Sequence, residues 1–109
     1  MVAEQAGEIA GYVLVLQRSN SRSYRVYALV VDERFTRQGI GKQLLDWAHD
    51  YAKNHGGEQL HLEVQASNVA AVALYTGSGY TRRKYLPGYY QDGSDGLQMV
   101  KRLVGAAGI

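Results

Sequence analysis

The sequence predicts an α/β (α+β) fold, a mixed and mostly antiparallel twisted sheet with a central βαβ unit. Three consecutive segments carry this prediction. An apolar run at residues 24–31 precedes an amphipathic helix at 40–55, and apolar and polar residues then alternate at 60–65 with the period of a strand. Two strands that flank a helix at this spacing are expected to lie parallel, joined by a right-handed crossover.

The segment before this unit predicts a further strand. Residues 9–16 are apolar on both alternating sets, which is typical of a strand covered on both faces. The polar segment 17–23 is rich in turn formers and joins this strand to the next as a hairpin.

The helix at 40–55 has one apolar face, which indicates that it packs on the sheet. Its members are Ile40, Leu44, Ala48, Tyr51 and Ala52, with Trp47 at the edge, whereas Lys42, Asp46, Asp50 and Lys53 lie on the other side. Two glycines, Gly56 and Gly57, end the helix.

The last third of the chain predicts a second helix and two more strands. Ser67-Asn68 forms an N-cap for a helix at 69–76, which Gly77 and Gly79 end. Strands are expected at 80–85 and 97–103, with a turn-rich loop at 86–96 between them and a loose tail at 105–109. The whole chain therefore predicts a single domain of about five strands and two helices.

The composition is that of an ordinary globular protein, with 46% hydrophobic and 20% charged residues. The net charge of +2 is spread evenly along the chain, without the basic stripe of a nucleic-acid-binding protein, so no nucleic-acid partner is expected. No apolar run has the length of a membrane span, and residues 1–5 lack a signal-peptide pattern. The chain has no cysteine, so we expect neither disulfides nor a thiolate metal site. With no membrane span or signal-peptide pattern, a cytoplasmic protein is the default expectation.

A glycine-rich turn, Thr36-Arg37-Gln38-Gly39-Ile40-Gly41, opens the helix at 40–55. Glycines let the backbone lie close to a ligand, and a helix N-terminus presents unpaired N–H groups, so this turn predicts a phosphate cradle. A dinucleotide fingerprint is excluded because it needs glycine where Leu44 stands. A Walker loop is excluded because it needs glycine at Thr36 and a hydroxyl residue at Gln43. A tight turn without a ligand is the alternative.

Three motifs then follow one another along the chain: the turn at 37–41, the Ser67-Asn68 cap, and Ala73-Leu74-Tyr75 ahead of Gly79-Tyr80. In this combination residues 9–103 resemble the GCN5-related N-acetyltransferase (GNAT) superfamily. Residues 39–41 match the last three positions of the family's pyrophosphate loop, Gln/Arg-x-x-Gly-x-Gly/Ala, whereas Thr36 departs from the first. The resemblance implies the acyl-CoA N-acyltransferase fold, shortened at the N-terminus, and acetyl-CoA (coenzyme A) as the cofactor.

Within the superfamily, residues 62–68 with Ala71, Ala73, Leu74 and Tyr75 look most like bacterial enzymes that acetylate the N-terminal alanine of a ribosomal protein. The family normally begins with a strand and two helices that help to form the acceptor groove, whereas eight residues precede Ile9. We therefore expect either a short natural variant or a chain lacking part of the domain. A partner subunit, such as a second copy in a homodimer, is a candidate to complete the amine-binding side.

The resemblance implies a role for each candidate site residue. The pyrophosphate is held by Arg37, Gln38, Gly39, Ile40, Gly41 and Lys42. The backbone of Leu29, Val30 and Val31 binds the pantetheine arm as an added strand would, and Asn68 and Tyr75 complete the cofactor site. Tyr75 is the general acid and Glu63 the general base, while Tyr89 and Tyr90 contact the acceptor.

Structural alternatives stand beside these roles. Tyr75 is otherwise a core aromatic, Glu63 an exposed strand carboxylate and Asn68 a helix cap alone. His49, His55 and His61 show no metal spacing and are expected to be surface or packing residues.

The expected function is acetyl transfer from acetyl-CoA to a primary amine, with a protein or peptide N-terminus as the leading acceptor. Direct attack in a ternary complex is expected because no cysteine is available to carry the acetyl group. Two alternatives remain open: a small amine acceptor such as an antibiotic, a polyamine or an amino acid, and a CoA-binding module without turnover.

Overall fold

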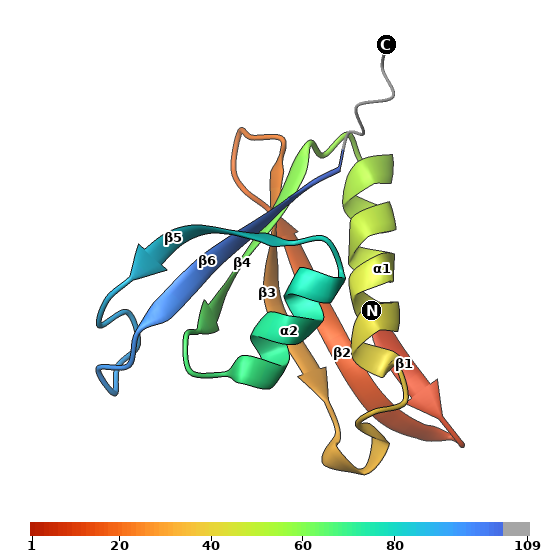
Figure 1. Cartoon of the computed structure of the whole chain (residues 1–109). Coiled ribbons are helices and arrows are strands. Elements are labelled where there is room, and N and C mark those ends of the chain that lie inside the picture. The colour runs from red at the N-terminus through yellow and green to blue at the C-terminus, as the bar shows by residue number, and fades with distance from the viewer. Residues whose placement is uncertain (104–109) are drawn as a thin grey trace.

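Six strands form one twisted sheet in the order β1-β2-β3-β4-β6-β5 (Figure 1). This computed structural model describes residues 1–103, and among them the β3–β4 pair is parallel while the other four pairs are antiparallel. The predicted mixed, mostly antiparallel sheet is therefore confirmed. The elements are β1 (Val2–Gln5), β2 (Glu8–Gln17), β3 (Ser23–Val31), the 3₁₀ turn η1 (Glu33–Phe35), α1 (Ile40–Asn54), β4 (Gln59–Gln65), α2 (Val69–Gly77), β5 (Thr81–Leu86) and β6 (Gly96–Arg102).

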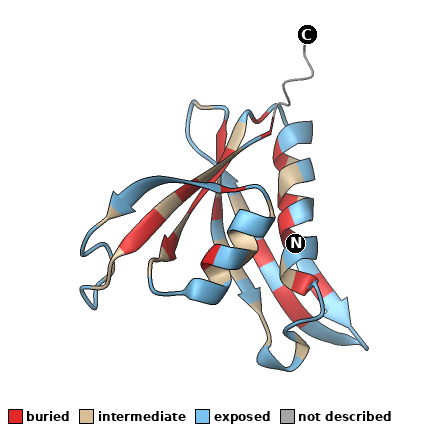
Figure 2. Cartoon of the chain, in the orientation of Figure 1, coloured by how far each residue is buried: buried red, intermediate tan, exposed pale blue. Residues whose placement is uncertain are grey.

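Helix α1 packs its apolar face against the sheet, and the buried positions run along one side of it (Figure 2). The buried residues are Ile40, Leu44, Leu45, Ala48 and Ala52. Leu45 lies outside the predicted stripe, while the predicted Tyr51 is only partly buried. On the sheet side, the alternation along β4 buries Leu60, Leu62 and Val64 in the same core.

Helix α2 begins at the predicted cap and lies against the start of α1. The Asn68 side chain accepts a hydrogen bond from the Ala71 N–H at 3.1 Å, so the capping prediction is confirmed. A Cβ at Gly41 would lie 3.0 Å from Leu74 Cδ2, which shows that α2 approaches the first turn of α1 closely. A larger residue at Gly41 would therefore require the Leu74 side chain to shift.

Strand β1 is an element that the sequence analysis missed. It forms a hairpin with β2 through the two-residue loop Ala6-Gly7, whose φ angles are 51° and 80°. Two consecutive positive φ angles are the geometry of a tight hairpin turn. The sheet therefore has six strands instead of about five, and Gly7 was the available indication of the turn.

The expectation that residues 9–16 are covered on both faces is wrong for the described chain. Ala10 and Val13 of β2 are buried under α1, but the opposite face of β1–β3 is open. Its apolar residues are 43–56% exposed: Val2, Tyr12, Leu14, Leu16, Tyr27 and Val30. Their cross-strand pairing, with Tyr12 opposite Val30, places them on one continuous surface.

Two further expectations concern the chain as a whole. The loose tail predicted at 105–109 lies outside the described residues. Among residues 1–103, neither helix is long and apolar enough to cross a membrane.

Two leucines on opposite faces of the sheet give a matched stability test. Leu44→Ala removes a side chain that is fully buried between α1 and the sheet, so we expect a loss of about 3 kcal/mol in the free energy of unfolding. Leu14→Ala removes the same atoms from the open face, where a loss below about 1 kcal/mol is expected. Urea denaturation measures both, and equal losses would contradict the placement of the core.

Candidate functional site

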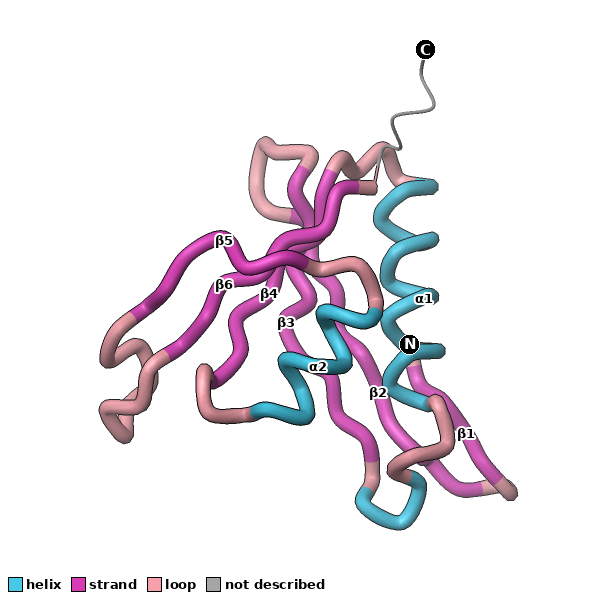
Figure 3. The backbone as a smooth tube through the Cα atoms, in the orientation of Figure 1, coloured by secondary structure: helices cyan, strands magenta, loops and turns pink. Residues whose placement is uncertain are grey.

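Strands β3 and β4 separate at the centre of the sheet. Their pairing ends at Arg25 opposite His61, although β3 continues to Val31 and β4 to Gln65 (Figure 3). The backbone edge of β3 from residue 26 to 31 therefore faces an opening without a strand partner among the described residues. Leu29, Val30 and Val31 lie on this edge, where an extended amide chain can add as a strand.

The glycine-rich turn beside this opening presents unpaired N–H groups. Gly39 caps α1 with a φ of 78° and no side-chain hydrogen bond, and Arg37 has a φ of 63°, a conformation that residues with a Cβ rarely adopt. No acceptor for the N–H groups of Ile40, Gly41 and Lys42 occurs within residues 1–103. A helix start with free N–H groups and left-handed residues before it is a binding geometry for phosphate.

The turn and α2 enclose a cavity of about 550 Å³. Of the predicted cofactor residues, Val31, Arg37, Gly39, Ile40, Gly41, Lys42 and Asn68 line it, whereas Gln38, Leu29, Val30 and Tyr75 do not. The lining also includes Phe35, Thr36, Ala70, Ala71 and Leu74, which were not predicted as cofactor contacts. Asn68 and the glycine-rich turn, about thirty residues apart in the sequence, therefore line one cavity.

Glu63 lies on the other face of the sheet from Leu62 and Val64, where β3 and β4 diverge. Its side chain is only 7% exposed, and its Oε1 is 2.7 Å from Nη2 of Arg25. The second oxygen, Oε2, is buried and has no hydrogen-bond partner. The alternative of an exposed strand carboxylate is therefore wrong: the Glu63 side chain is buried, and one of its two oxygens has no partner among the described residues.

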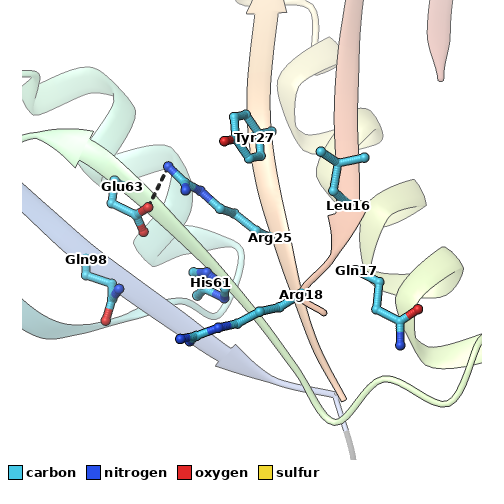
Figure 4. Close-up of a pocket in the computed structure, with 8 residues that line it drawn as sticks. All are labelled: Leu16, Gln17, Arg18, Arg25, Tyr27, His61, Glu63 and Gln98. Atoms are coloured by element: carbon cyan, nitrogen blue, oxygen red, sulfur yellow. Dashed lines mark ion pairs between the residues drawn. The ribbon is translucent and has the colours of Figure 1, made fainter. Parts of the chain in front are cut away.

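A cavity of about 400 Å³ opens over this ion pair (Figure 4). Its lining residues are Leu16, Gln17, Arg18, Arg25, Tyr27, His61, Glu63 and Gln98. The guanidinium of Arg25 lies 4.4 Å from the centre of the Tyr27 ring, so a cation–π contact and Glu63 together hold it. The cavity is thus polar at its floor and apolar along its Leu16 and Tyr27 wall.

The three histidines have different environments. His61 is buried at the end of this cavity, and its Nδ1 is 2.9 Å from Oγ of Ser23. Burial lowers the pKa of His61, so it stays neutral at pH 7. His55 is exposed and stacks on Tyr51, while burial lowers the pKa of the partly buried His49.

Tyr75 lies on α2, half-buried, with its ring in edge contact with Tyr80 at 6.0 Å between centroids. Burial raises the pKa of its hydroxyl, and the neighbouring Tyr90 adds to the shift. Among residues 1–103 no hydrogen bond contributes to the pKa shift of this hydroxyl, so its proton is available to another acceptor. The role of Tyr75 as general acid stays a prediction.

The tyrosines of the 87–95 loop border the Glu63 region. Tyr89 lines a third cavity with Glu63, Arg83, Lys84, Leu86 and Gln98, and its ring meets that of Tyr90 edge-on at 5.0 Å. Asp95 fixes the loop, because its carboxylate accepts hydrogen bonds from the Tyr85 hydroxyl and the Gly88 N–H. Burial is the main cause that raises the pKa of Tyr90, with Tyr89 and Glu63 adding to it.

Comparison with known proteins agrees with this geometry. The model of the acetyltransferase (GNAT) domain family matches residues 1–103. An uncharacterized N-acetyltransferase of Methanocaldococcus jannaschii is 37% identical over 109 residues, covering 98% of this chain and 68% of that protein. The ribosomal protein bS18-alanine N-acetyltransferase of Escherichia coli is 41% identical over 66 residues, which cover 57% of this chain and 45% of the enzyme.

Solved structures share the fold. The E. coli ribosomal-protein-S18-alanine N-acetyltransferase has a TM-score of 0.83 at 31% identity, covering 94% of this chain and 67% of that one. The NatC complex bound to Gag peptide and CoA has a TM-score of 0.83 at 25% identity, covering 94% and 66%. The chain therefore belongs to the GNAT family of acetyl-CoA-dependent N-acetyltransferases.

Proposed function

We propose that the chain acetylates the N-terminal amine of a protein or peptide. The observation that carries the proposal is the position of Glu63, a buried carboxylate with one free oxygen at the point where β3 and β4 part. The segment that contains it, from Leu62 to Tyr75, carries the motif that resembles the bacterial ribosomal-protein enzymes, and the E. coli enzyme is 41% identical to this chain over 66 residues. The loop tyrosines beside Glu63 suit an extended acceptor chain.

The cofactor fits the cavity at the start of α1. The unpaired N–H groups of residues 40–42 and the side chain of Arg37 hold the pyrophosphate, and the free edge of β3 binds the amide arm. Acetyl-CoA supplies the acetyl thioester when bound. Asn68 lines the same cavity and its amide is positioned by the cap of α2.

The chain's own residues then move two protons. Glu63 accepts a proton from the acceptor ammonium at Oε2, directly or through one water, and leaves the neutral amine. The amine nitrogen forms a bond to the acetyl carbon as the carbon–sulfur bond breaks, and the Tyr75 hydroxyl donates its proton to the departing thiolate. The second proton that the nitrogen loses as the amide forms passes to the Tyr75 phenolate, directly or through water, and Glu63 releases its proton to solvent. Because the chain has no cysteine to carry the acetyl group, the group passes directly to the amine in one ternary complex. We place this reaction in the cytoplasm.

Gly41 gives a test of the cofactor cavity. In Gly41→Val the new Cβ lies 3.0 Å from Leu74 and the larger side chain pushes α1 and α2 apart, so we expect CoA affinity to fall about tenfold in calorimetry. Gly77→Ala is the matched control, because its Cβ meets nothing within 4 Å and Gly77 lies outside the cavity lining. Unchanged affinity in Gly41→Val would place the cofactor elsewhere.

A panel of acceptors tests the proposed function. The purified chain is given acetyl-CoA with free-N-terminal peptides, the same peptides with a blocked N-terminus but a free lysine, and a polyamine. Thiol release and mass spectrometry then locate the acetyl group. Acetylation only at free N-termini supports the proposal, acetylation of the polyamine alone would show a small-amine enzyme, and CoA binding without turnover would show a binding module.

A further inference from the structure

The side chains that line the two cavities around Glu63 carry more positive than negative charge. Arg18 and Arg25 line the cavity over Glu63, and Arg83 and Lys84 line the neighbouring cavity that shares Glu63 and Gln98. Figure 4 shows the side chains of Arg18 and Arg25 reaching across β4 on either side of His61. Among residues 1–103, Glu63 is the only carboxylate that lines either cavity.

Three of these four cationic side chains take part in no ion pair of the described fold. The ion pairs found within residues 1–103 include Arg25 with Glu63 but none with Arg18, Arg83 or Lys84. His61 adds no charge at pH 7 because burial keeps it neutral. The two cavities that share Glu63 are therefore lined by four basic side chains and one carboxylate. This excess of positive charge favours an anionic ligand.

The Arg25–Glu63 pair also restricts which amine can reach Glu63. An acceptor ammonium can bind at the free Oε2 while Arg25 stays at Oε1, but transfer of its proton to Glu63 leaves this guanidinium, whose Nε is buried without a partner, short of a counter-charge. An acceptor that brings its own carboxylate supplies that counter-charge. Its ammonium takes Glu63 and its carboxylate takes Arg25, with Arg18 beside it.

We infer that the acceptor carries a carboxylate close to its reacting amine, bound by Arg25 and Arg18 while the amine lies at Glu63. The inference rests on the proposed function, because it assigns the substrate class of the same site. The chemistry has two sources: a peptide with an acidic side chain in its first residues, and a free amino acid with its α-carboxylate.

Matched acceptors separate these sources. Peptides that begin Asp-Ala and Asn-Ala differ by one negative charge at the first side chain. L-alanine and L-alaninamide also differ by one negative charge, and their rates are compared for the deprotonated amine because the carboxylate also changes the pKa of that amine. Whichever of the two pairs the chain acetylates, we expect kcat/KM to be about tenfold higher for its acidic member than for its neutral member. Raising the salt concentration lowers the rate for the acidic acceptor and leaves the neutral one nearly unchanged, because screening acts on the charge contact.

Variants of the exposed Arg18 connect the preference to this cavity. Arg18→Gln lowers the ratio of acidic to neutral acceptor rates, and Arg18→Glu reverses it in favour of a peptide that begins Lys-Ala. Arg22→Gln is the matched control, because Arg22 lies on the same β2–β3 connection but pairs with Glu58 and lines neither cavity. Its ratio stays at the wild-type value.

The outcomes are distinguishable. Equal kcat/KM for Asp-Ala and Asn-Ala peptides overturns this inference and leaves the proposed function standing. Turnover of alanine but not alaninamide, with no peptide acetylated, overturns the peptide acceptor and supports the carboxylate requirement. A rate ratio that Arg18→Glu does not move overturns the assignment to this cavity.

Discussion

Tyr75→Phe is expected to lower kcat by about a hundredfold or more while the affinity for CoA stays nearly unchanged. The substitution removes one hydroxyl from a half-buried ring and leaves its edge contact with Tyr80. Because burial raises the pKa of Tyr75 above its ordinary value of 10, the hydroxyl keeps its proton throughout the neutral range. Single-turnover measurement with saturating acetyl-CoA isolates this chemical step.

The pH dependence separates an acid from a packing residue. A departing thiolate needs no proton at a pH above the pKa of its thiol, so the defect of Tyr75→Phe should become smaller as the pH rises through that pKa. Tyr51→Phe is the control, because Tyr51 is also a partly buried helical tyrosine but stacks on Trp47 of α1. A rate equal to wild type in Tyr75→Phe would remove Tyr75 from the mechanism.

The elements that follow from local patterns were predicted well. The helix at 40–55 and the strand at 60–65 have strong periods, and the Asn68 cap depends only on residues next to it, so their bounds agree with α1, β4 and α2 within one residue. The face of Glu63 also follows from strand alternation. These features depend on chemistry within a few residues, which a sequence displays directly.

Tertiary relations were not predictable in the same way. The Arg25–Glu63 pair joins residues on two strands that touch only because β3 and β4 meet in register before they split. The apolar pattern of residues 9–16 shows which side chains avoid water but not whether another element covers them, and the described chain leaves Leu14 exposed. Strand β1 was missed because four residues are too few for a period and alanine is an unusual first residue for its turn.

Glu63→Gln is the second substitution with a large expected effect. It keeps the size of the side chain but removes the base, so we expect kcat at pH 7 to fall about a hundredfold or more. An N-terminal amine loses its own proton with a pKa of about 8, so the rate of the variant should recover as the pH rises through that value. A pH–rate profile therefore distinguishes loss of a base from general damage.

A second effect has to be separated from the loss of the base, because Glu63→Gln also leaves the Arg25 guanidinium without its counter-charge. The double variant Glu63→Gln with Arg25→Gln removes that stranded cation, and kcat of both variants is compared at a saturating concentration of a neutral acceptor, which does not use Arg25 for binding. If the base is what was lost, the double variant stays as slow as the single one at pH 7. If the stranded cation caused the defect, the double variant recovers and Glu63 is not the base.

Glu58→Gln is the matched control, since it breaks an ion pair of similar length, 2.9 Å between Glu58 and Arg22. The side chains of Arg22 and Glu58 are 74% and 56% exposed. Such a surface pair contributes little to stability and lies outside both cavities, so its activity and pH profile are expected to match wild type.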